Sequence, residues 1–200
     1  MKKLLFIFFS IILLSACNNE AEVANYIKQA DTYREEGRLV DAISLYNKAL
    51  DLKEDSKIRE KLNETEKEKE TIEKTQNALD IFKEVDTYYL QDSDYVSPVK
   101  IKEATDKLRD AIDEIEKLDD TKQTDISEFV KNLKESSDYK QVKNYVESNV
   151  TDDAETMESL AFLYEDFQVL NEVGASLFNI IGVNISNIAN MEIPSKYKEN

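Results

Sequence analysis

The sequence predicts an all-α protein, a helical hairpin followed by an antiparallel bundle of about four long helices. Only 3 glycines and 2 prolines punctuate 200 residues, and no Asn-Gly or Asp-Gly pair offers the tight turn of a β-hairpin. Charged residues make up 34% of the chain, with lysine and glutamate interleaved. Apolar residues recur every three or four positions, which is the period of an amphipathic helix. These observations argue against a β-rich fold.

The first 16 residues predict a secretory signal peptide that is removed from the mature chain. Two lysines give it a basic start, residues 4–14 form an apolar core, and small residues follow at Ser15 and Ala16. The apolar run is too short to predict a membrane span. We therefore expect an exported protein whose mature chain begins just after this segment.

Cys17, the only cysteine, follows directly. The run Leu14-Ser15-Ala16-Cys17 resembles the lipobox of bacterial lipoproteins. That resemblance implies a diacylglycerol and fatty acids such as palmitate on Cys17, which becomes the first mature residue. Each buried acyl methylene adds about 0.8 kcal/mol of membrane affinity, so the lipid would hold the chain at the extracytoplasmic face of the cell membrane. Residues 17–22 are then a short polar leash. The alternative is a buried thiol behind an ordinary cleaved signal.

Residues 23–56 contain two amphipathic segments that meet at Gly37, which predicts a helical hairpin with Gly37 in the left-handed conformation. The spacing of nine residues resembles one tetratricopeptide repeat: Tyr26, Ala30, Tyr33, Gly37, Leu39, Ala42, Tyr46, Ala49 and Leu50. A peptide-binding groove in that family needs several stacked repeats, so one repeat implies the fold and not the groove. The residues that would line a groove are Ile27, Asp31, Arg34 and Glu35, which we expect to be solvated or covered by the next helix.

Residues 57–192 are expected to form the bundle. The segment 57–89 predicts one long helix whose charged first half is a solvated face, although Ile58 and Leu62 could pack as a cap on the hairpin. Pro98, with Ser97 as its cap, is expected to start the next helix. Its seam comprises Ile101, Ala104, Leu108, Ala111, Ile115 and Leu118.

Two capping signals predict the helices that follow. Asp125 with Glu128 resembles a capping box and opens a helix that runs to about Ser148, with a kink expected at residues 136–138. Asp152 with Glu155 repeats the signal and opens a helix through Leu170. Residues 193–200 are expected to be a tail.

Residues 173–191 contain no charged side chain, which is unusual in so charged a protein. Three interpretations compete: a helix at the centre of the bundle, a helix that contacts or spans the membrane, and a surface for self-association. Several asparagines and serines in this segment argue against burial in the hydrocarbon of a bilayer, because each side chain would need a hydrogen-bond partner there. Burial of Leu177, Ile181, Ile185 and Ile188 against other helices would favour the first interpretation.

The composition limits the chemistry. Histidine is absent, which excludes a histidine-based triad and any histidine-ligated metal site. No glycine-rich loop suits the binding of a phosphate. We therefore expect no catalytic residue, cofactor or metal. Without residues 1–16 and their two lysines, 24 basic and 42 acidic side chains leave a net charge of −18, which disfavours nucleic acid. Acidic pairs such as Glu165 and Asp166 keep a carboxylate-based cell-wall hydrolase as an alternative.

These observations favour a non-catalytic scaffold or adaptor that is anchored to the membrane through Cys17 and binds another exported or membrane protein. Self-association through residues 173–191 is a further expectation. A membrane-active or ligand-carrying protein that uses the same apolar segment is the second alternative.

The Cys17→Ala variant is expected to keep the folded body while losing lipid labelling and membrane retention, since the acyl chains are its proposed anchor. Metabolic labelling with a fatty acid, followed by fractionation, measures both effects. Label that persists in the variant would contradict the assignment.

Overall fold

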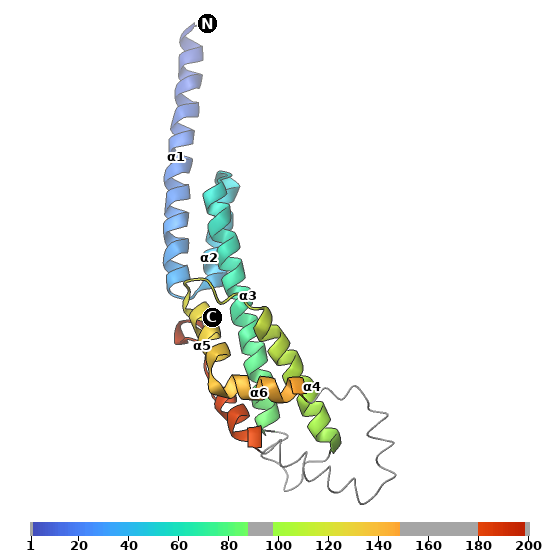
Figure 1. Ribbon diagram of the computed structural model, residues 1–200. Coiled ribbons are helices and arrows are strands. Elements are labelled where there is room, and N and C mark those ends of the chain that lie inside the picture. Colours follow the sequence, from blue (N-terminus) through green and yellow to red (C-terminus); the bar gives the residue numbers. More distant parts are fainter. Residues whose placement is uncertain (1, 88–97, 149–179, 199–200) are drawn as a thin grey trace, which may run out of the picture. The chain divides into compact units, whose positions relative to one another are not determined.

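The computed structural model describes residues 2–87, 98–148 and 180–198, and within these ranges the protein is helical with no strand (Figure 1). The predicted all-α class and helical bundle are confirmed. The chain divides into two compact units, one of residues 1–70 with 194–200 and the other of residues 71–193. The division differs from the predicted boundary at residue 57, because the first part of the third helix packs on the hairpin and the tail returns to it.

The first unit contains α1 (Lys2–Glu35), α2 (Leu39–Leu52) and the first part of α3 (Ser56–Val85). Figure 1 shows α1 and α2 as an antiparallel pair, as predicted for the hairpin. Helix α1 also includes the segment predicted as a signal peptide and the one predicted as a polar leash. No glycine or proline interrupts these residues, so the helix continues through both.

The turn between α1 and α2 depends on Gly37, which has φ +81° as predicted. The Gly37 N–H donates to the Arg34 carbonyl at 3.0 Å, and the Arg38 N–H donates to the Tyr33 carbonyl at 2.8 Å. This pair of bonds is a Schellman motif, which satisfies carbonyls that the end of α1 would otherwise leave without donors.

Small residues allow α1 and α2 to pack closely. Ala30, Ala42 and Ala49 are fully buried, and the ring of Tyr46 fills the seam beside them. Ile58 and Leu62 of α3 belong to the same apolar cluster. The expectation that these two residues cap the hairpin is therefore confirmed.

The second unit contains the rest of α3, α4 (Pro98–Lys117), α5 (Asp125–Glu135), α6 (Ser137–Ser148) and a helical segment at residues 180–189. Pro98 is the first residue of α4, as predicted, whereas Ser97 and the helix predicted from Asp152 lie outside the described residues. The seam of α4 is buried except at Ile101, which is half-buried. The largest fully buried side chains of this unit are Phe82, Val85, Leu108, Ile115, Ile126, Val130, Leu133, Tyr139, Ile185 and Ile188.

Two details of α5 and α6 differ from the sequence prediction. The N-cap of α5 is Thr124 and not Asp125: the Thr124 hydroxyl accepts a hydrogen bond from the Ser127 N–H at 3.2 Å. Ser136 then has extended backbone angles, φ −62° and ψ 148°, so the expected kink is a complete break between two helices. Figure 1 shows that α6 changes direction after this break.

The apolar segment 173–191 contributes core residues to the second unit over its described part. Ile181, Ile185 and Ile188 are buried, while Leu177 lies outside the described residues. The Ser186 hydroxyl donates to the carboxylate of buried Asp86. Two asparagines on the same segment also hydrogen-bond to other helices: Asn184 donates to Gln141 at 3.2 Å, and Asn187 donates to Asp138 at 3.3 Å. Burial and hydrogen bonding both support the central-helix interpretation here.

Across the described ranges, no helix has the length and apolarity needed to cross a bilayer.

Substitutions within this helical segment test its role as core. Ile185 is 0% exposed and Val183 is 67% exposed. We expect Ile185→Ala to lower the free energy of unfolding by about 2–4 kcal/mol, because it removes buried methylenes and leaves a cavity. The matched Val183→Ala should change it by less than about 0.5 kcal/mol. Urea unfolding followed by circular dichroism measures both, and equal losses would contradict the assignment.

Candidate functional site

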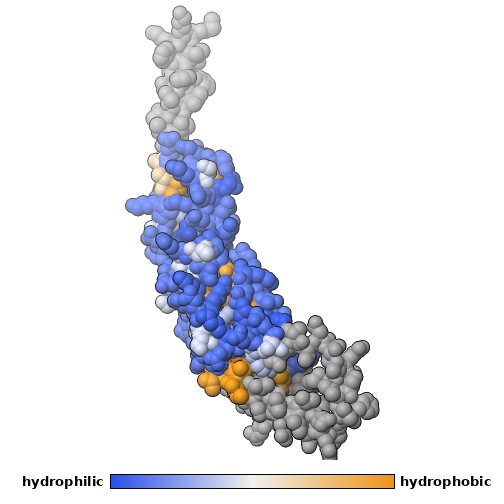
Figure 2. Space-filling model, viewed as in Figure 1, coloured by the Kyte–Doolittle hydropathy of each residue, from blue (hydrophilic) through white to orange (hydrophobic). Residues whose placement is uncertain are grey.

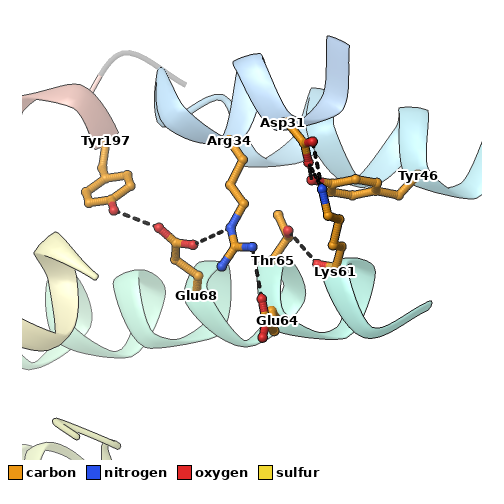
Figure 3. Close-up of polar contacts among 8 residues, drawn as sticks. All are labelled: Asp31, Arg34, Tyr46, Lys61, Glu64, Thr65, Glu68 and Tyr197. Atoms are coloured by element: carbon orange, nitrogen blue, oxygen red, sulfur yellow. Dashed lines mark hydrogen bonds and ion pairs between the residues drawn. The ribbon is translucent and has the colours of Figure 1, made fainter. Parts of the chain in front are cut away.

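The face of α1 that would line a groove is covered by α3, and charged side chains fill the space between them. Figure 3 shows this polar cluster, here called the Glu68 network; its members are Asp31, Arg34, Tyr46, Lys61, Glu64, Thr65, Glu68 and Tyr197. The expectation that the next helix covers this face is confirmed for Asp31 and Arg34. Ile27 is half-buried in the hairpin core, and Glu35 is exposed.

One end of the network is centred on Asp31. The Lys61 ammonium donates to both carboxylate oxygens of Asp31 at 2.7 Å, and the Tyr46 hydroxyl donates to one of them at 2.5 Å. Burial, together with the bond to the Asp31 carboxylate, raises the pKa of the Tyr46 phenol above its ordinary value. Tyr46 therefore stays a neutral donor beside a charged acceptor.

The other end is centred on Arg34, which holds two carboxylates of α3. Its Nε donates to Glu68 at 3.0 Å and its Nη1 donates to Glu64 at 3.1 Å. The side chains of Glu64 and Glu68 are 49% and 6% exposed, so only the second pair is shielded from water. A charge that is this buried is stabilised only when it is paired and hydrogen-bonded.

The tail supplies the second partner of Glu68. The Tyr197 hydroxyl donates to the other Glu68 oxygen at 2.7 Å, and the Tyr197 ring is buried. Tyr197 ends the short 3-10 helix η2 (Ser195–Tyr197), whose backbone lies against the turn between α1 and α2. A Cβ atom on Gly37 would lie 2.2 Å from the Lys196 carbonyl oxygen, so only glycine leaves room for the tail.

The spacing of residues along α1 and α3 explains why these groups meet. Asp31 and Arg34 lie three positions apart on one face of α1, and Lys61, Glu64 and Glu68 lie at steps of three and four on α3. The order of charges is acid then base on α1 and base then acid on α3. In the register that the structure shows, each charge of this α1 pair lies opposite charges of the other sign on α3.

Sequence reasoning missed Glu68 and Tyr197, because the first was assigned to a solvated charged face and the second to a tail. A signal for Glu68 exists in the sequence, because the buried positions of α3 follow steps of four, three, three and seven residues, namely Ile58, Leu62, Thr65, Glu68 and Thr75. The apolar stripe of α3 thus continues through polar residues. Thr65 satisfies its hydroxyl by donating to the Lys61 carbonyl at 2.8 Å.

Cys17, Glu165 and Asp166 are the remaining residues that the sequence singled out. Cys17 lies within the backbone range of α1, and its lipidation stays a prediction. Glu165 and Asp166 lie outside the described residues. Within the described ranges, no group of three or more cysteine, aspartate or glutamate residues is arranged to hold a metal ion.

Comparison with protein-family models, curated proteins and solved structures finds no match for this chain.

Paired substitutions test the unequal roles of the two carboxylates that bind Arg34. We expect Glu68→Ala to lower the free energy of unfolding by about 2–3 kcal/mol, since it removes hydrogen bonds to a buried charge. The Glu64→Ala change removes a half-exposed partner of the same guanidinium and should cost less than about 1 kcal/mol. Chemical denaturation at neutral pH measures both. A Glu64 effect as large as that of Glu68 would show that burial does not set the strength of these contacts.

Proposed function

We propose that this protein is a non-catalytic scaffold or adaptor, anchored through lipid on Cys17 at the extracytoplasmic face of the cell membrane. The observation that carries the proposal is the continuity of α1 from the Cys17 position into the folded hairpin. Val23 is already buried in the hairpin core, and Glu20 forms an ion pair with Lys53 at 3.4 Å. At about 1.5 Å rise per residue, the six helical steps from Cys17 to Val23 span about 9 Å. A lipid at Cys17 would therefore hold the hairpin close to the bilayer.

The surface of the folded chain supports binding to another protein. The face drawn in Figure 2 is predominantly hydrophilic, and the precursor carries a net charge of −16. This charge favours a basic partner and disfavours nucleic acid. Because α3 and the tail cover the inner face of the hairpin, such a partner would use the outer helical surface or displace a segment of this chain.

Self-association is a second candidate, and one observation favours it. Ile180 and Val183 are 68% and 67% exposed on the helical segment whose opposite side is core. Contact between two such apolar faces would bury both of them.

A carboxylate-based hydrolase is the alternative from another class, and the two carboxylates that bind Arg34 give it little support. Glu64 and Glu68 both bind Arg34, and Glu68 is 7% exposed, so a polysaccharide could not reach it. Such an enzyme would need two accessible carboxylates about 5–10 Å apart across a cleft.

Photo-crosslinking in cells tests both candidates. A photoreactive amino acid is introduced at exposed Val40 or Val183, in the natural chain and in the Cys17→Ala variant. The scaffold proposal predicts a discrete adduct with another exported or membrane protein that weakens without the anchor. Self-association predicts an adduct of twice the chain mass from Val183 alone. The same adducts in both backgrounds would contradict a role for the anchor, and no adduct at either position would contradict both candidates.

A further inference from the structure

Within the first unit, the tail contacts the hairpin and α3 in the manner of a bound peptide. Pro194, with φ −52° and ψ 134°, leads into the single turn of η2, and Tyr197 at its end is the one buried residue among residues 194–198. The Lys196 ammonium lies 4.8 Å from the centre of the Tyr197 ring, a cation-π contact within the segment itself. Residues 194–198, here called the tail segment, thus present one aromatic anchor on a short turn.

The residues of α1 and α3 that contact the tail segment are held in place by contacts with one another. Arg34 binds one oxygen of Glu68, and Glu64 binds the same guanidinium, so the second Glu68 oxygen is oriented by its neighbours on α1 and α3. When the tail segment leaves, Glu68 keeps its ion pair and gains water. The open site would therefore keep its geometry, which lowers the entropic cost of binding a ligand.

Gly37 gives the site its backbone specificity. Its φ of +81° is set by the turn between α1 and α2, and its missing side chain lets the Lys196 carbonyl approach. A ligand must therefore cross this turn with its backbone and direct a hydrogen-bond donor to Glu68. Arg34, Gly37 and Glu68 together are here called the tail site.

We propose that the tail site is a peptide-binding site, and that the tail segment is its resident ligand, displaceable by a segment of another polypeptide with the same chemistry. The ligand class is a proline-led turn that ends in tyrosine, whose phenol donates to the Glu68 carboxylate. A tethered ligand has an effective concentration of about millimolar, so a competing segment binds weakly until the tail segment is released. Such a site would give the proposed scaffold a means of binding its partner, and only this biological role rests on the proposed function. Peptide binding itself is a property of the purified chain.

A fluorescent peptide with the sequence of residues 192–200, EIPSKYKEN, tests the proposal on the full chain in detergent solution. Fluorescence anisotropy should show affinity at least about tenfold higher for the Tyr197→Ala variant than for the natural chain, since the variant's own tail no longer competes. The Ser195→Ala variant, changed at an exposed position in the same turn, is the matched control and should bind as the natural chain does.

Two further measurements identify the contact. A peptide with phenylalanine at the tyrosine position should bind the Tyr197→Ala variant about tenfold more weakly, through loss of a hydrogen bond to a charged group. Adding Glu68→Gln to that variant should weaken binding of the tyrosine peptide and reduce the preference for tyrosine over phenylalanine, because an amide oxygen is a weaker acceptor than a carboxylate. If circular dichroism shows that Tyr197→Ala is unfolded, Tyr197→Phe serves as the recipient, with the same order of affinities.

Equal affinity for the natural chain and the folded variant, equal affinity for the two peptides, or no binding at about 1 mM peptide would each overturn the proposal. None of these results depends on lipid at Cys17 or on a cellular partner, so failure here is distinguishable from failure of the proposed function.

Discussion

The carboxylate of Glu68 is the constraint on which the first unit depends. It is 7% exposed, and its two oxygens accept from Arg34 on α1 and from Tyr197 in the tail. A buried charge without a paired donor would strongly destabilise the fold, so Glu68 depends on Arg34, and the tail adds the Tyr197 hydroxyl as a second donor where it covers Glu68. One side chain thereby ties α1, α3 and the tail, although Glu68 and Tyr197 are 129 positions apart in sequence.

Helix α3 packs in two different ways along its length. Its first part meets the hairpin through Ile58 and Leu62 and then through ion pairs, whereas its second part contributes Phe82 and Val85 to an apolar core. The polar part of α3 therefore adds paired and hydrogen-bonded charges to the contact with α1, and the apolar parts add most of the stabilising burial.

Local patterns predicted the local structure well. The hairpin, the left-handed Gly37 and the start of α4 at Pro98 follow from periodicity and turn chemistry, whereas the buried isoleucines of residues 180–189 favour one of the three interpretations that the sequence left open. The site was not predictable in the same way, because nothing near Glu68 in the sequence indicates that Tyr197 will reach it. The cap of α5 was missed by one residue, since Thr124 and Asp125 are adjacent and both residue types are good caps.

A double-mutant cycle between Arg34→Ala and Tyr197→Phe tests the central claim most directly, because the two residues are coupled through the Glu68 carboxylate that both bind. If that carboxylate joins the three segments, the free energies of unfolding of the single and double variants will reveal a coupling energy of about 0.5–3 kcal/mol. Additivity within about 0.3 kcal/mol would contradict the account.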